Sequence, residues 1–167
     1  MALPSAALPS ADLEELGLPA ARAELAAALA TGPLLVNYVG HGGVDRMAHE
    51  GLLTAADVAT LPATETAAIV SAWTCVLARI DLPAFDSLGE LLVLTPQGGA
   101  AAVVAPTGLS VAGQAHVLNR LYFEALGRHE RVGDALLEAV QHFREQGGLE
   151  ALPRTYAILG DPAVLVY

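Results

Sequence analysis

The residues of this chain best suited to chemistry are His41 and Cys75, a histidine and the only cysteine, which lie 34 positions apart. A thiol acts as a nucleophile in its thiolate form, and a neighbouring imidazole can carry the proton that the reaction moves. Each residue follows a mostly apolar run, 34–39 before the histidine and 67–73 before the cysteine. If both runs are parallel strands of one sheet, the two side chains meet at one edge. The pattern therefore indicates covalent catalysis by a thiol and an imidazole.

Each of the two residues also has a purely structural interpretation. His41 lies in the glycine-rich string 40–43, where glycine allows a sharp turn and a close approach to a ligand, so the Gly42 amide is a candidate oxyanion donor. The same string fits a plain turn with a surface histidine. Cys75 alone fits a buried apolar filler, but its position just beyond Trp73, where the chain leaves the core, favours an exposed thiol.

Other catalytic centres find less support in the sequence. Zinc held by His41, His49 and Cys75 is conceivable, but their spacing matches no recognised ligand pattern and no second cysteine exists. The sequence contains no Gly-x-Ser-x-Gly elbow, Walker loop or dinucleotide fingerprint. The remaining histidines fall on expected helices, at surfaces or helix ends: His116, His129 and His142. We therefore expect neither a metal nor another cofactor.

Local patterns predict helices and strands in alternation. After a loose lead-in over 1–10, helical segments are expected at 10–30 with a break at Pro19, at 54–61, at 87–94, at 114–127 and at 131–146. Ser87 and Glu90 match a capping box for the third of these. Apolar runs predict strands buried on both faces at 34–39, 67–73 and 100–105, with further extended segments at 156–159 and 164–166 and an irregular loop at 44–53.

This alternation favours a mostly parallel α/β sheet with helices on both faces. Ligands of such sheets bind at the carboxyl ends of the strands. His41, Cys75 and the loop 106–113 each follow an expected strand. Three strand ends are therefore expected to converge on one site.

Composition limits the classes of partner. The 167 residues, 54% hydrophobic with a mean hydropathy of +0.49, suit one globular domain. A net charge of −10 argues against nucleic acid, and it fits either a basic substrate or simply a solvated acidic surface. A single cysteine excludes an intrachain disulfide, no run is long enough to span a membrane, and the first residues do not resemble a signal peptide.

An apolar block ending in His-Gly, followed by a second ending in Cys, resembles the caspase-like (clan CD) cysteine peptidases, and the fuller match is to the gingipain-like family. The resemblance covers residues 31–167. The segments that carry it are 36–43, the strand to Cys75, 87–90 before 98–100, 106–108 and 159–163. We accordingly divide the chain into a lead-in and helix over 1–30 and the C-terminal portion of a caspase-like domain over 31–167.

The resemblance implies a cysteine endopeptidase that works through a thioester, with His41 and Cys75 as the catalytic dyad and the amides of Gly42 and Cys75 around the oxyanion. It also implies a preference for a basic residue before the cut and a secreted or cell-surface location. Trp73, Thr107 and Gly108 are expected to line a substrate pocket, although Trp73 equally fits the core.

The family's catalytic domain has further α/β structure before the histidine strand. The resemblance therefore implies a three-layer sandwich that lacks its N-terminal edge here, and a preceding portion or a partner chain that completes the sheet. Residues 73–74 and 76–79 depart from the family's pattern around the cysteine. The alternative is a non-catalytic caspase-like module for interaction or assembly.

Overall fold

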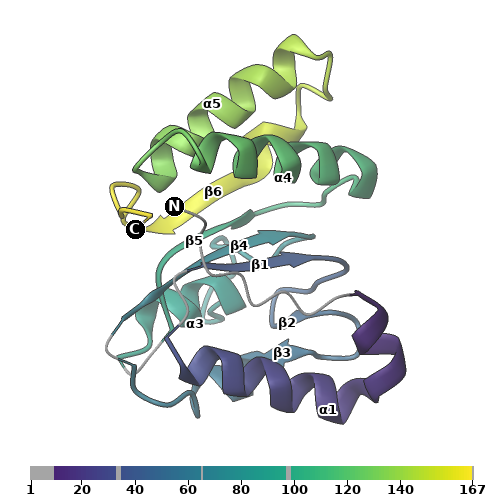
Figure 1. The fold of residues 1–167 in the computed structure, drawn as a ribbon, viewed down its shortest axis with the longest axis vertical. Coiled ribbons are helices and arrows are strands. Elements are labelled where there is room, and N and C mark those ends of the chain that lie inside the picture. Colours follow the sequence, from purple (N-terminus) through teal and green to yellow (C-terminus); the bar gives the residue numbers. More distant parts are fainter. Residues whose placement is uncertain (1–9, 33–34, 65, 97–98, 167) are drawn as a thin grey trace.

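A four-stranded sheet forms the centre of the protein, for which the computed structural model describes residues 10–32, 35–64, 66–96 and 99–166 (Figure 1). Its strands are β1 (Leu35–Val39), β4 (Ala68–Trp73), β5 (Ala100–Pro106) and β6 (Tyr156–Gly160), in the spatial order β1-β4-β5-β6. The first three run parallel and β6 pairs antiparallel to β5. The predicted mostly parallel α/β sheet is confirmed.

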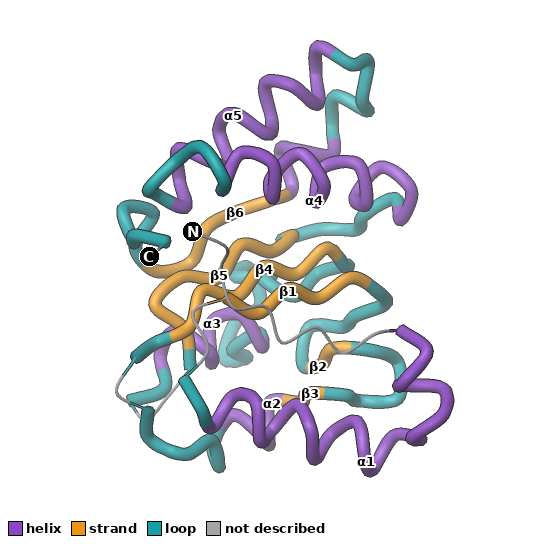
Figure 2. The backbone as a smooth tube through the Cα atoms, in the orientation of Figure 1, coloured by secondary structure: helices purple, strands orange, loops and turns teal. Residues whose placement is uncertain are grey.

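Helices cover both faces of this sheet and give three layers (Figure 2). On one face lie α4 (Ala112–Leu126) and α5 (Val132–Glu145), and on the other lie α1 (Ser10–Ala30), α2 (Ala55–Val58) and α3 (Leu88–Leu94). A single 3₁₀ turn, η1 (Leu152–Thr155), leads into β6. In the described part of the chain, no helix has the length and apolar character needed to cross a bilayer.

The central strand β4 is buried along its whole length. Its side chains alternate, so that Ile69 and Trp73 belong to the core under α4 and α5, whereas Val70 and Ala72 belong to the core on the opposite face. This alternation has the period of two of any strand, and both faces are apolar because helices cover both. The run 67–73 is therefore mostly apolar because both faces of β4 are covered by helices.

Strand β1, in contrast, lies at the edge of the sheet and pairs only with β4 among the described residues. Asn37 and Val39 are exposed, Val39 to 47%. The prediction that this strand is buried on both faces is therefore wrong, because an apolar run is covered only where the tertiary structure supplies neighbours. Leu34, the first residue of the predicted strand, lies outside the described residues.

Several local predictions need correction. The expected loop 44–53 contains a small antiparallel ribbon of β2 (Arg46–Met47) and β3 (Leu53–Thr54). The helix expected to run to Leu61 ends after one turn, and the segment 164–166 forms only one isolated bridge, between Arg131 and Leu165. The break in α1 falls at Gly17, which adopts φ 71°, two residues before Pro19. The capping box of Ser87 and Glu90 is confirmed.

Candidate active site

The ends of β1 and β4 bring His41 and Cys75 to the same edge of the sheet. Val39 lies opposite Trp73 in the parallel ladder, so each of the two candidates follows the last paired position by two residues. Gly42, which follows His41, lies close to Thr74, which precedes Cys75. A Cβ added to Gly42 would be 2.4 Å from Thr74 Oγ1. The two loops are therefore packed directly against each other.

The loop of His41 is held by its backbone. Tyr38 Oη donates to the His41 carbonyl oxygen at 2.5 Å, and the Ala48 amide donates to that carbonyl and to Tyr38 Oη, each at 2.8 Å. The Gly43 amide donates to the Arg46 carbonyl at 2.9 Å. Gly42 lies between these two bonded positions, where the alternation of an antiparallel pair turns its amide away from the ribbon. The side chain of His41 itself is exposed.

The thiol of Cys75 is half-buried and lies against the loop that follows β5. Its Sγ is 3.4 Å from the Ser110 amide nitrogen and 3.7 Å from the Ser110 carbonyl oxygen. The amide can donate to sulfur, and the protonated thiol can donate to the carbonyl. Ser110 therefore contacts the proposed nucleophile. The sequence placed Ser110 only within the broad loop 106–113.

The backbone beyond Cys75 is strained and firmly tied. Val76 has φ 49°, in the left-handed region that β-branched residues seldom adopt. Its amide donates to the Gly108 carbonyl at 3.0 Å, and the Ala78 amide donates to the Pro106 carbonyl at 2.9 Å. These bonds hold the turn against the end of β5. Strain of this kind is commonly found at functional sites.

Trp73 is 2% exposed and lies inside the core rather than on a pocket wall. Its indole N–H donates to Asn37 Oδ1 at 3.0 Å, and Ser71 Oγ donates to the same oxygen at 2.8 Å. The ring stacks on Tyr156 with centroids 5.0 Å apart. Through these contacts Trp73 connects the strand of His41 with the strand of Cys75, and its contact with a substrate stays a prediction.

Thr107 and Gly108, the other expected pocket residues, face the interior of the loop region. The amide and Oγ1 of Thr107 both donate to the Thr155 carbonyl, at 2.7 and 3.0 Å. Gly108 uses its carbonyl to hold Val76. In this structure the two residues support the Cys75 loop from behind, and their contact with a substrate stays a prediction.

The structure also identifies contributors that the sequence did not single out. Tyr156 lies 46 residues beyond Ser110, yet their hydroxyl oxygens are 3.4 Å apart. Burial raises the pKa of Tyr156 to about 12, a rise that the bond from Ser110 opposes and a charged Cys75 reinforces. Thr74 Oγ1 is buried with no hydrogen-bond partner among the described residues. No local pattern signals such contacts, because they join distant segments.

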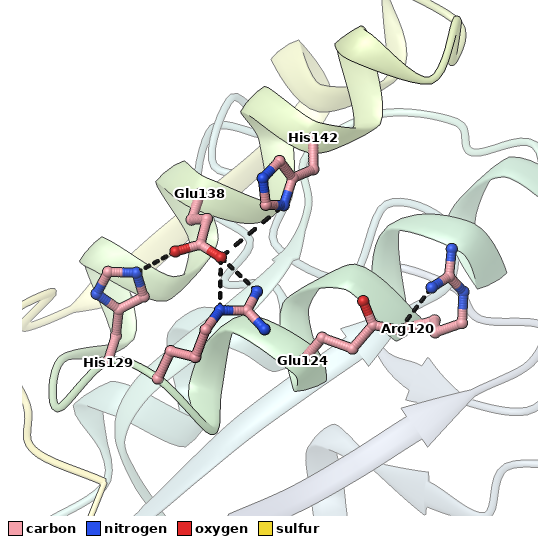
Figure 3. A network of polar contacts seen from close by, with 6 residues as sticks. Arg120, Glu124, His129, Glu138 and His142 are labelled. Carbon is pink, nitrogen blue, oxygen red and sulfur yellow. Dashed lines mark hydrogen bonds and ion pairs between the residues drawn. The ribbon is translucent and has the colours of Figure 1, made fainter.

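His129 and His142 belong to a separate network of polar contacts around α5. His129 Nε2 lies 2.5 Å from a carboxylate oxygen of Glu138 on α5, and His142 Nδ1 lies 3.8 Å from the other (Figure 3). Arg128 Nε also donates to Glu138, at 2.9 Å. Bonds from Arg128 and His129 hold the pKa of the Glu138 carboxyl below its usual range. The described residues contain no group of three His, Cys, Asp or Glu side chains that could hold a metal.

Comparison with known proteins places this geometry in context. The model of Peptidase family C25 matches residues 6–167. No curated protein matches the sequence. Among solved structures, the complex of the pro- and mature domains of Porphyromonas gingivalis RgpB has a TM-score of 0.77 at 18% identity, over 86% of this chain and 36% of its own.

Two further solved structures are similar. The crystal structure of the Arg specific cysteine proteinase gingipain R (RgpB) has a TM-score of 0.73 at 20% identity, over 86% of this chain and 36% of its own. A structure described as that of a protease has a TM-score of 0.71 at 19% identity, over 84% of this chain and 37% of its own. The present chain thus spans little more than a third of each neighbour.

Proposed function

This chain belongs to peptidase family C25, and from that premise we propose that it carries the catalytic dyad of a cysteine endopeptidase, with Cys75 as nucleophile and His41 as proton carrier. The observation that supports the proposal best is the parallel register of β1 and β4, from which both residues leave at one edge. Packing of Gly42 on Thr74 adds that the two loops are in contact.

In the proposed reaction, the thiol of Cys75 passes its proton to His41 and the sulfur attacks the scissile carbonyl carbon. Negative charge moves to the carbonyl oxygen, where the amides of Gly42 and Cys75 donate hydrogen bonds. His41 then protonates the leaving amine as the C–N bond breaks, which leaves a thioester. A water deprotonated by His41 attacks the thioester, and the acid product and the thiol are released.

The preference for a basic residue before the cut is a second part of the proposal. Its support is the net charge of −10 and the printed description of gingipain R as Arg specific. Two acids on the loops that follow the strands form exposed ion pairs, Asp45 with Arg46 and Asp81 with Arg79. Either pair would have to open before its carboxylate could bind a basic substrate side chain.

Labelling by peptidyl acyloxymethyl ketones tests both parts on the 167-residue chain. We expect one label on Cys75, none in Cys75→Ala, and a rate lowered about 100-fold in His41→Ala because no base activates the thiol. Of three electrophiles that end in Arg, Leu or Asp, the one that ends in Arg should label Cys75 fastest. A folded wild-type chain that is not labelled, or an undiminished rate in His41→Ala, contradicts the dyad, and a fastest reaction with Leu or Asp contradicts the basic preference.

The edge strand favours a second candidate function, a non-catalytic module for assembly. Among the described residues no strand pairs with the outer side of β1, which offers backbone groups and the exposed Val39 to another strand. We propose that a preceding portion of the domain or a partner chain pairs there. A folded chain that is not labelled at Cys75 but binds such a segment would favour this role over catalysis.

A further inference from the structure

A pair of hydroxyl groups, one on the half-buried Ser110 and one on the buried Tyr156, belongs to the surroundings of the thiol. Ser110, whose amide is 3.4 Å from Cys75 Sγ, has its own hydroxyl oxygen 3.4 Å from Tyr156 Oη. The oxygen separation exceeds the about 2.8 Å of a typical O–H···O bond, so the contact is a weak one in this state. Tyr156 is 8% exposed, so most of its side chain is removed from water.

Three other elements fix the position of Tyr156. It begins β6, where it pairs in register with Pro106 at the end of β5. Its ring stacks on Trp73 at an interplanar angle of 30°, and Trp73 is in turn bonded to Asn37 on β1. The hydroxyl that reaches Ser110 is thus attached to the same framework that joins the histidine strand to the cysteine strand.

A second tyrosine on the same tryptophan provides a contrast. Tyr122 packs on Trp73 with ring centroids 5.4 Å apart and is fully buried. Its hydroxyl has no hydrogen-bond partner among the described residues. The two tyrosines therefore share a packing role, but only Tyr156 has a hydroxyl directed to the loop that contacts the thiol.

We propose that Tyr156 and the Ser110 side chain are positioning residues for Cys75, which hold the Ser110 amide where it stabilises the thiolate. This inference rests on the proposed function, since it assigns a supporting group to the same nucleophile. When the thiol loses its proton, the Ser110 carbonyl loses its donor, and the Ser110 amide remains as a donor to the negative sulfur. Helix α4 begins at Ala112, two residues after Ser110. The positive end of the helix dipole therefore lies close to Ser110 along the chain.

The test measures the rate of Cys75 labelling at one pH, with the peptidyl electrophile and with iodoacetamide, in Tyr156→Phe and in its matched control Tyr122→Phe. Removing the hydroxyl of Tyr156 should slow both reactions about three- to tenfold, as expected for the loss of one neutral hydrogen bond. Tyr122→Phe should stay within about twofold of the wild type, because its hydroxyl has no partner to lose.

Two Ser110 variants separate positioning from general stability. Ser110→Ala should slow labelling like Tyr156→Phe, the double variant should be no slower than the slower single variant, and Ser110→Thr should restore most of the rate by keeping a hydroxyl. Equal rates in Tyr156→Phe and Tyr122→Phe, or independent effects of Ser110→Ala and Tyr156→Phe, would overturn the inference. Failure of the peptidyl electrophile on wild type concerns the proposed function alone, since iodoacetamide still reports on the sulfur.

Discussion

The candidate site has a thiol side, around Cys75, and a histidine side, around His41, and the two differ in how many contacts hold them. On the thiol side, the turn after Cys75 is bonded to Gly108 and Pro106, and its sulfur lies against Ser110. The strand that leads to it is buried along its length. The position of the sulfur is therefore determined by contacts that this chain makes with itself.

On the histidine side, the supporting structure is thinner. His41 follows an edge strand, and among the described residues the hydrogen bonds to it, from Tyr38 and Ala48, reach only its carbonyl oxygen. The segment that continues from this loop faces α1 across an open pocket of about 280 Å³. Arg22 spans this gap and bonds to the Gly51 carbonyl and to Asp57.

The difference indicates how catalysis would be assembled in this protein. A nucleophile needs a fixed position and a stable charge, which the buried strands β4 and β5 can supply. A proton carrier must change partners during the reaction, and an exposed imidazole on an edge strand is freer to do so. We infer that the thiol is preorganised by this chain, whereas the orientation of the His41 ring depends on what covers β1 and on the substrate.

Among the changes that test this comparison, Gly42→Ala, at the contact between the two sides, has the largest expected effect. The added Cβ would lie 2.4 Å from Thr74 Oγ1 and 3.1 Å from the Thr74 methyl group, so the loops must separate. We expect a loss of about 1–3 kcal/mol in the free energy of unfolding and a labelling rate lowered at least about tenfold. In the control Gly43→Ala the nearest atom is the flexible end of Asp45 at 3.4 Å. If Gly42→Ala and Gly43→Ala had equal stabilities and equal labelling rates, the described contact between Gly42 and Thr74 would be contradicted.

A smaller effect is expected from Val76→Gly, which tests the strain on the thiol side. Glycine adopts φ 49° without the cost of a side chain, so the variant should be up to about 1 kcal/mol more stable in chemical denaturation. The freer backbone should nevertheless slow the labelling of Cys75. Ala84→Gly, at φ 60° in an exposed loop, is the matched control, with the same relief and no change in labelling. A destabilised Val76→Gly would mean that packing of the valine outweighs the strain.

The smallest expected effect is a loss of stability in acid on the histidine side, where Asp57 pairs with Arg22. Burial acts to raise the pKa of Asp57, but bonds from Thr54 and the charge of Arg22 outweigh it, so the pKa lies below its ordinary 3.8. A lowered pKa contributes stability above pH 3.8, and that contribution is lost as the pH falls through the folded value. The partly exposed pair is worth less than about 1 kcal/mol.

The protection factors of the α1 amides against hydrogen exchange should therefore fall below pH 4, before those of β4 and β5 do. Arg22→Ala should produce the same loss of protection at pH 7. Arg79→Ala, which breaks the exposed pair with Asp81, should leave α1 unchanged. Faster exchange in β5 than in α1 on acidification would reverse the comparison between the two sides.

Local sequence patterns determined most of the elements and indicated the two central residues of the candidate site. The period of side-chain burial and the helix signals, such as Ser87 followed by Glu90, are properties of a few consecutive residues. They are enough to predict a parallel α/β sheet, and the rule that ligands meet the carboxyl ends of its strands then selects His41 and Cys75.

The tertiary structure alone decided which strand lies at the edge and what stands behind the thiol. An apolar run has the same sequence pattern whether it is central, as β4 is, or peripheral, as β1 is, because the neighbours come from elsewhere in the chain. Trp73 fitted both a pocket and a core until its partners Asn37 and Tyr156 were seen. The contact of Tyr156 with Ser110 joins residues 46 positions apart, and no local periodicity records such a distance.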